Sequence, residues 1–140
     1  MAPVSTYSDV NLWAAAVSKA FSCPDEELES HLLSHLYTKD SIITVNGQEM
    51  TWDAFLAYLK IVRGAVSSVD VSPHHLLRDG RRFAIRHTSR GHRHEGPESH
   101  IEAMVMGEVD DEGRALWVEE VANFVEGTHP AQGDQDINDD

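Results

Sequence analysis

The periodicity of the apolar residues changes near Gly64, and this change constrains the fold more than any other feature of the sequence. Before it, over residues 8–64, apolar side chains recur every three or four residues, the spacing of helices that bury one face. After it, apolar and polar residues alternate, which is typical of half-buried strands. Helices followed by hairpin-connected strands indicate an α+β domain, with helices covering one face of an antiparallel sheet.

The first half of the chain contains signals for three helices and one short strand. Ser8 is a candidate N-cap for the first helix, and Pro24 is a candidate first-turn residue for the second. Thr51 is a candidate N-cap for the third helix, whose buried face would include Trp52. The β-branched segment Ser41–Asn46 predicts a strand between the second and third helices.

The second half predicts four strands. Asp79-Gly80 and the segment Asp110–Gly113 have the composition of tight hairpin turns, and Gly91–Glu98 would form a longer loop between the middle strands. The expected strands cover Val69–Arg78, Arg81–Arg90, Ser99–Val109 and Arg114–Phe124.

The charge and the cysteine content argue against several classes of protein. A formal net charge of −13 disfavours nucleic-acid binding, because phosphates require a basic surface. Cys23 is the only cysteine, so no internal disulfide can form, and we expect a cytoplasmic protein in a reducing environment. No apolar run approaches the roughly 20 residues that span a bilayer, and the first residues lack the pattern of a secretory signal. We expect one domain over residues 1–126 and an acidic, disordered tail over 127–140.

Alternation along the expected strands places three titratable side chains on apolar, inward faces. His75 is inward in the first strand of the second half, unless a bulge at Pro73 exchanges it with His74. His87 and Glu120 lie in apolar rows of the second and fourth strands. One inward histidine is more often a hydrogen-bonded core residue. Desolvation shifts the pKa values of a carboxyl and an imidazole in ways that suit general acid–base catalysis, so the three together are the candidate catalytic residues.

The strand Ser99–Val109 has large apolar residues on both faces, so its pattern does not decide which face is inward. This is expected if one face lines a pocket and the other meets a second subunit. The arginines of the strand Arg81–Arg90 mostly face outward. There they either pair with acids in solvent or contact residues such as Glu108 and Glu119 of a second copy.

A resemblance to a known family covers residues 8–124. It rests on the order of elements and on Tyr37–Leu56, His74–Gly91 and Gly113–Phe124, which are similar to the SnoaL-like polyketide cyclases of the nuclear-transport-factor-2-like (NTF2-like) superfamily. Scytalone dehydratase, ketosteroid isomerase and limonene epoxide hydrolase are relatives. The resemblance implies a cone-shaped curved sheet wrapped by three helices around a pocket. It also implies acid–base chemistry without cofactor or metal on hydrophobic polyketides or terpenoids.

The resemblance extends to the candidate catalytic residues. Glu120 falls where the last strand of the family commonly presents a catalytic carboxylate. His75, or His74, and His87, or His92, fall in the region of the two histidines of scytalone dehydratase. The tyrosine pair of that enzyme has no clear match in this chain, although Tyr37 and Tyr58 are available.

The resemblance also suggests substrate-positioning residues. Asn46 is in the place of an asparagine of the epoxide hydrolase, and His100 and Glu102 occupy positions where the dehydratase has polar residues. The expected apolar lining of the pocket is Trp52, Phe83, Met104 and Met106.

A rival constellation, His92, His94 and Glu98, imitates the metal motif of cupins. Two imidazoles and a carboxylate would suit iron, manganese or zinc. However, Arg86 stands where that motif begins with glycine, and no second histidine motif follows. We therefore expect no metal.

These observations predict a cofactor-independent enzyme of secondary metabolism, an isomerase, cyclase or dehydratase acting on a hydrophobic polyketide or meroterpenoid. We expect a homodimer formed through the sheet, with no nucleic-acid or membrane partner. Two alternatives stay open: a non-catalytic ligand-binding or dimerisation module of the same fold, and a metal-dependent enzyme that uses the loop with His92, His94 and Glu98.

Overall fold

The computed structural model describes residues 6–124, so the tail expected over 127–140 lies outside the described residues. Short 3₁₀ turns at Thr6–Ser8 and Asp25–Glu27 precede the first two helices. The helices are α1 (Val10–Lys19), α2 (Leu28–His35) and α3 (Trp52–Ala65). The strands are β1 (Tyr37–Val45), β2 (Gln48–Met50), β3 (Val66–Asp79), β4 (Arg82–Arg93), β5 (Ser99–Val109) and β6 (Ala115–Phe124). No helix in this part of the chain is long and apolar enough to cross a membrane.

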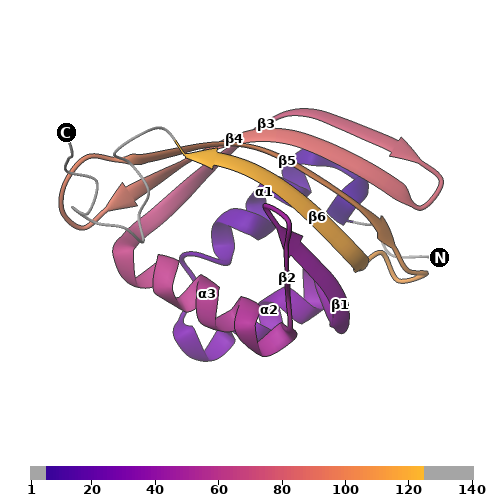
Figure 1. Cartoon of the computed structure of the whole chain (residues 1–140), viewed down its shortest axis with the longest axis horizontal. Helices are drawn as coiled ribbons and strands as arrows, with labels where there is room; N and C mark the ends of the chain where they lie inside the picture. Colours follow the sequence, from indigo (N-terminus) through magenta and orange to yellow (C-terminus); the bar gives the residue numbers. More distant parts are fainter. Residues whose placement is uncertain (1–5, 125–140) are drawn as a thin grey trace.

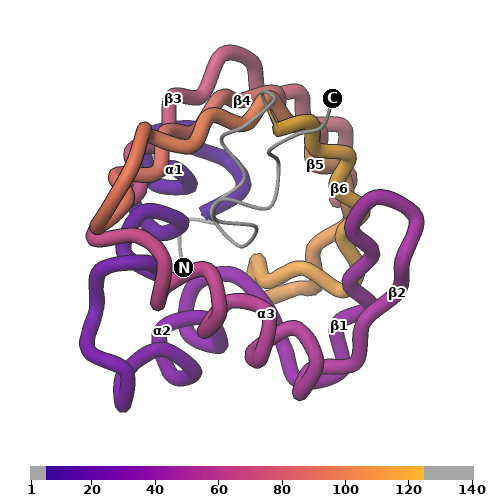
Figure 2. Tube along the Cα trace, turned by 60° about the vertical axis from the view of Figure 1, so that its left-hand side comes forward, coloured from indigo at the N-terminus to yellow at the C-terminus, as the bar shows by residue number. Residues whose placement is uncertain are grey.

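The strands form one six-stranded sheet in the order β2-β1-β6-β5-β4-β3. The sheet curves, and the three helices lie on its concave side (Figure 1). Viewed from another side, helices and strands surround a common interior (Figure 2). The expected α+β arrangement is confirmed, but the sheet is not wholly antiparallel because β1 pairs with β6 in parallel. This pairing joins the first half of the chain to its last strand.

The helix boundaries follow from local hydrogen bonding. Asp9, and not Ser8, is the N-cap of α1, because its carboxylate accepts backbone N–H groups of the next turn at 2.9 and 3.2 Å. Pro24 precedes the 3₁₀ turn, and α2 itself begins only at Leu28. Thr51 caps α3 as predicted, accepting the N–H three residues ahead at 3.1 Å.

The inward face of β5 is the face that carries Ala103 and Val105, which are buried. Met104 and Met106 lie on the outer face, where they are 42% and 41% exposed. The methionines were expected to line the pocket, and that expectation is wrong. Both faces are apolar, so only the position of the helix layer shows which one is covered.

Gly107 lies where two other parts of the sheet approach its backbone closely. A Cβ atom at this position would clash with the carbonyl oxygen of Trp117 and would lie 2.8 Å from the Phe83 ring. The Phe83 ring in turn packs on Tyr7, with ring centroids 4.3 Å apart. A side chain at Gly107 would therefore displace the contact that joins the N-terminal segment to the sheet.

We predict that Gly107→Ala lowers the free energy of unfolding by about 1–3 kcal/mol, because the added methyl group overpacks this site. Gly64→Ala is the matched control. Its Cβ would meet nothing within 4 Å, and it lies in α3. Alanine there should raise stability by about 0.5–1 kcal/mol. Urea unfolding followed by circular dichroism measures both, and a stability loss of equal size in both variants would contradict the packing argument.

Candidate active site

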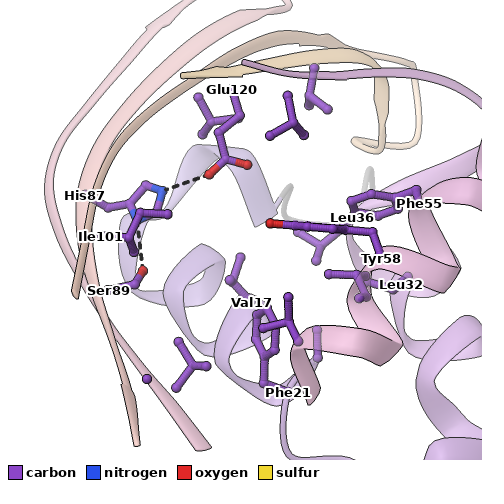
Figure 3. A pocket seen from close by; sticks show the side chains of 18 of the residues that line it. Val17, Phe21, Leu32, Leu36, Phe55, Tyr58, His87, Ser89, Ile101 and Glu120 are labelled. Carbon is purple, nitrogen blue, oxygen red and sulfur yellow. Dashed lines mark hydrogen bonds and ion pairs between the residues drawn. The ribbon is translucent and has the colours of Figure 1, made fainter. Parts of the chain in front are cut away.

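A cavity of about 150 Å³ lies between the concave face of the sheet and the helices. Most of its wall is apolar, and Figure 3 shows part of it. Its apolar lining includes Val17, Phe21, Leu32, Leu36, Phe55 and Ile101. Its polar lining includes Tyr58, His87, Ser89, Ser99 and Glu120. A cavity of this volume accommodates about one aromatic ring.

His87 and Glu120 meet inside this cavity although two strand steps separate them in the sheet. His87 is paired with Ala103 across β4 and β5, and Glu120 is paired with Val105 across β5 and β6. Both side chains are on the concave face, and the curvature of the sheet directs them toward each other (Figure 3). His87 Nε2 lies 4.0 Å from Glu120 Oε2.

Desolvation controls the charge of both groups. Burial raises the pKa of Glu120 from 4.5 to about 7. Its side chain lines the cavity and is 31% exposed. Burial, with a smaller contribution from His74, lowers the pKa of His87 from 6.5 to about 4. At neutral pH the imidazole is uncharged and the carboxyl is close to half protonated. The pair is therefore not an ion pair, because desolvation of the charges outweighs their attraction.

Two hydroxyl groups and one aromatic ring lie near His87 and Glu120. The hydroxyl of Ser89 lies 3.2 Å from His87 Nδ1, and the Trp13 ring packs edge-on against the imidazole at a centroid distance of 4.9 Å. Tyr58 extends from α3 on the opposite wall, with its hydroxyl directed toward Glu120 and His87 (Figure 3). Burial, and then the charge of Glu120, raises the pKa of Tyr58, so this phenol remains a hydrogen-bond donor at neutral pH.

The predicted catalytic residues are only partly brought together. His87 and Glu120 face the cavity as the strand pattern indicated, and their catalytic role stays a prediction. His75 does not face it, and the expected inward direction is wrong. A bulge shifts the β3 register between Pro73, which pairs with His87, and His75. The extra residue, His74, reverses the alternation, and both histidines are exposed.

The residues expected to bind substrate do not line the cavity. Trp52 is buried against α2, where its Nε1–H donates to Glu29 at 2.7 Å. Phe83 packs on Tyr7 in the core. Asn46 occupies a turn with a positive φ of 49°, and its side-chain oxygen accepts the backbone N–H of Ala122. The remaining four lie on the outer face of β5: His100, Glu102, Met104 and Met106.

Ser89 and Tyr58 are two polar cavity residues that strand and helix patterns did not single out. Ser89 follows His87 by two residues, so period-two alternation already places it on the same face. Tyr58 follows Phe55 by one helical turn, at the margin of the buried stripe of α3. Each could have been found by extending the inward pattern from the apolar residues to their polar neighbours.

The arrangement of His92, His94 and Glu98 does not match the hypothesis that they form a metal site. Both ring nitrogens of His92 lie 2.7 Å from carboxylate oxygens, one of Asp70 and one of Glu98. These acids raise the pKa of His92 and favour the imidazolium, which does not bind a metal. His94 is exposed in the loop. Within residues 6–124 no group of three or more potential ligands is placed to hold a metal ion.

Known proteins resemble this chain in sequence or in architecture. No family model matches the sequence. An uncharacterized protein of Schizosaccharomyces pombe is 28% identical over 109 residues, which is 78% of this chain and 82% of that protein. An NTF2-like protein of unknown function from Exiguobacterium sp. 255-15 is 17% identical, with a TM-score of 0.62 over 78% of this chain and 96% of its own. The chain has the NTF2-like fold.

Two further structures with the NTF2-like fold carry names that refer to polyketides. IdmH of Streptomyces antibioticus, a proposed polyketide cyclase, is 18% identical, with a TM-score of 0.60 over 84% of this chain and 93% of its own. A SnoaL-like protein of Shewanella denitrificans OS-217, also a proposed polyketide cyclase, is 16% identical, with a TM-score of 0.58 over 79% of this chain and 87% of its own. At these identities the likeness establishes the fold.

We predict that Glu120→Gln stabilises the protein in a pH-dependent manner. The folded state holds the Glu120 proton more tightly than the unfolded chain, so the wild-type protein loses stability as the pH rises from about 4.5 to about 7. The variant has no carboxyl at this position, so its stability does not fall in this way. The difference in free energy of unfolding between the variant and the wild type should grow across that window and level off above it at about 1–3 kcal/mol.

Glu119→Gln is the matched control, because Glu119 is the adjacent acid and is exposed on the other face of β6. Urea unfolding at several pH values measures the differences. A Glu120→Gln gain that is independent of pH, or one that Glu119→Gln reproduces, would contradict the burial argument.

Proposed function

We propose that this protein is a cofactor-independent enzyme that transfers protons on a small hydrophobic substrate with a carbonyl or hydroxyl oxygen. The observation that carries the proposal is the pair of Glu120 and His87, 4.0 Å apart, in a cavity whose wall is mostly apolar. Isomerisation, cyclisation or dehydration of a polyketide or meroterpenoid fits this chemistry. The polyketide names of two structural neighbours support the substrate class.

The separation of the two groups suits two neighbouring atoms of one substrate. At 4.0 Å the imidazole and the carboxyl are too far apart for a direct hydrogen bond. A substrate beside both groups can present its carbonyl oxygen to His87 and the adjacent C–H group to Glu120. A site within reach of an acid–base group and a donor is the geometry required for proton transfer beside a polarised oxygen.

Each polar group has a distinct role in the proposed reaction. Ionised Glu120 takes a proton from a carbon next to the carbonyl, and the C–H electron pair moves into the new C=C bond while the carbonyl π pair moves to oxygen. His87 and Tyr58 donate hydrogen bonds to that oxygen, where charge develops. Protonated Glu120 then returns the proton to another carbon, or to a leaving hydroxyl in a dehydration. A pKa of about 7 lets one carboxyl perform both steps.

The cavity also limits the substrate. Among the residues that line it within the described chain there is no lysine or arginine, so nothing there would compensate a substrate carboxylate or phosphate. Its volume fits about one ring, so a larger substrate would leave part of its skeleton outside. The expected ligand is therefore neutral, with its reacting end about one ring in size.

We predict that the protein accelerates exchange of α-protons for deuterium in one-ring ketones, with cyclohexanone, cyclohex-2-enone and acetophenone as probes. Proton NMR in D₂O measures the exchange rate. Glu120→Gln should reduce the catalysed rate by about 100-fold or more, because the general base is lost. Glu119→Gln should retain the wild-type rate.

The result would overturn the proposal if Glu120→Gln and the wild type exchange protons at the same rate. Binding of these ketones without any catalysed exchange would instead favour a non-catalytic ligand-binding module of the same fold.

We further propose that two copies pair through the outer face of the sheet. Met104 and Met106 form an exposed apolar centre there. Arg86 of β4 lies on one side of it and Glu119 of β6 on the other. Both are exposed, and neither has an ion pair within the described chain. A two-fold axis parallel to the strands would place each arginine opposite the acidic side of the other copy.

The corresponding prediction is that Met104→Lys combined with Met106→Lys converts a dimer into a monomer, because four lysines would face one another across the interface. Light scattering after size-exclusion chromatography measures the mass. Ile61→Lys is the control, because Ile61 is 60% exposed on α3, away from this face. A wild-type protein that is monomeric at micromolar concentration would refute the pairing.

A further inference from the structure

We infer that Ser99 determines substrate specificity, and that its hydroxyl binds a second oxygen of the substrate, a hydroxyl or carbonyl group about one ring away from the reacting carbonyl. The inference rests on the proposed function for the position of the reacting carbonyl. It adds that the substrate carries two oxygen-bearing groups at opposite ends of its buried part.

The hydroxyl of Ser99 differs from the other buried polar groups in having no hydrogen-bond partner within the described chain. Four polar residues of residues 6–124 are buried: His31, Ser41, His87 and Ser99. His31 and Ser41 bond to backbone carbonyls at 2.7 and 2.6 Å, and His87 bonds to a neighbouring hydroxyl at 3.2 Å. Ser99 is 5% exposed and forms no such bond. An unpaired buried hydroxyl costs free energy that a ligand oxygen would offset.

This hydroxyl borders the cavity and is not sealed in the protein core. Ser99 is the first residue of β5 and lines the cavity. In the described chain, the side-chain polar atoms that are fully enclosed without a partner are Nε of Arg63 and Nε of Arg114. The Ser99 hydroxyl is not one of them, so it faces space that a ligand atom can enter.

A glycine on the neighbouring strand makes room for the hydroxyl. Gly91 of β4 pairs with Ser99. A Cβ atom at Gly91 would clash with Ser99 Oγ and would lie 3.2 Å from the side chain of Val66. The hydroxyl therefore lies over the bare backbone of Gly91. Glycine inside a strand often marks such a place, where a ligand or another group approaches the backbone closely.

The residues next to this pair hold both strands in place without using the Ser99 hydroxyl. His92 Nδ1 lies 2.7 Å from Glu98 Oε2, which joins the residue after Gly91 to the residue before Ser99. His92 Nε2 lies 2.7 Å from Asp70 Oδ2 on β3. The hydroxyl is thus fixed before a ligand arrives, and a preorganised group loses less entropy on binding.

The wall around Ser99 is otherwise apolar. Val69 of β3 pairs with Gly91, and Ile101 follows Ser99 by two residues on the same face. Both line the cavity, as does Val66. One polar group in apolar surroundings fixes the orientation of a ligand, because its oxygen has a single place to bond.

The strand register gives the distance between the two polar ends of the cavity. Ser99 pairs with Gly91, and Ala103 pairs with His87. Four residues of strand separate these pairs, which is about 13 Å, and the concave curvature shortens it. With a hydrogen bond of about 2.8 Å at each end, the two ligand oxygens would lie about 8 Å apart or less. One ring with oxygen-bearing groups at opposite positions has this length.

The test compares the binding of two ketones to the full-length protein. 4-(Hydroxymethyl)acetophenone and 4-ethylacetophenone differ in whether the far substituent ends in a hydroxyl or a methyl group. Shift changes in ¹H–¹⁵N NMR spectra measure each Kd. Ser99→Ala should reduce the preference for the hydroxyl ketone, expressed as the ratio of the two Kd values, about 2- to 10-fold, the range of one hydrogen bond. The ligand hydroxyl can donate or accept, so the result does not depend on which group donates.

Ser72→Ala is the matched control, because Ser72 is an exposed serine of β3 outside the cavity lining, and its loss should leave the ratio unchanged. Ser99→Cys, whose thiol is a weaker partner, should give an intermediate ratio. A Kd ratio that Ser99→Ala leaves unchanged would overturn the inference. A lower urea midpoint in Ser99→Ala would also overturn it, because the hydroxyl would then be bonded within the protein.

The ketone-exchange assay separates this inference from the proposed function. If the protein is the proposed enzyme, Ser99→Ala should raise KM for the hydroxyl ketone with little change in kcat, because Ser99 is remote from the reacting carbon. Absence of catalysed exchange, together with the expected change in the Kd ratio, would refute the enzyme and leave the role of Ser99 standing. Catalysed exchange with an unchanged Kd ratio would refute only the role of Ser99. A wild-type protein that binds neither ketone at millimolar concentration would refute both.

Discussion

The candidate site depends on the desolvation of one carboxyl group, that of Glu120. Hydrogen bonds on both edges of its strand fix the backbone that directs this group inward. Glu120 lies on β6, which is paired on both edges, with β1 in parallel and β5 antiparallel. Asn46 joins the β1–β2 turn to the same stretch. Its backbone N–H donates to the carbonyl of Glu120 at 2.8 Å, and its side chain accepts from Ala122 at 2.8 Å. With its backbone held on both sides, the Glu120 side chain must point into the cavity.

The distribution of charged side chains leaves the pKa of Glu120 raised, so that this carboxyl is partly protonated at neutral pH. The arginines of β3 and β4 lie away from the cavity lining; Arg78, for example, bonds to Ser8, and Arg90 pairs with Glu98. No cation within the described lining offsets the burial of Glu120, so its pKa rises instead of falling. His87 supplies no charge either, because the same apolar surroundings favour its neutral form. A chain with a net charge of −13 thus keeps a partly protonated acid in its interior.

Sequence patterns located the site where strands were regular and failed where one was not. His87 and Glu120 lie in strands whose alternation is unbroken around them, so the inward direction could be deduced from their neighbours. His75 lies beyond a bulge, and one extra residue reverses every later side chain in its strand. The expectation that Met104 and Met106 line the pocket was wrong for another reason. Apolar residues on the outer face of β5 give no sign of which side the helices cover.

The sequence by itself determined the three helices, five of the six strands described, the Thr51 cap, the hairpin turns near Gly80 and at Asp110–Gly113, and which residues of β4 and β6 face inward, because each depends on residues close together in the chain. It did not indicate β2, and β4 continues to Arg93 into the expected loop. Only the tertiary structure decided that β1 joins β6, that His74 and His75 face outward, and that Glu120, His87 and Tyr58 converge. These outcomes depend on sheet curvature and on pairing between distant segments. Neither leaves a local pattern in the sequence, because both arise from the sum of many non-local contacts.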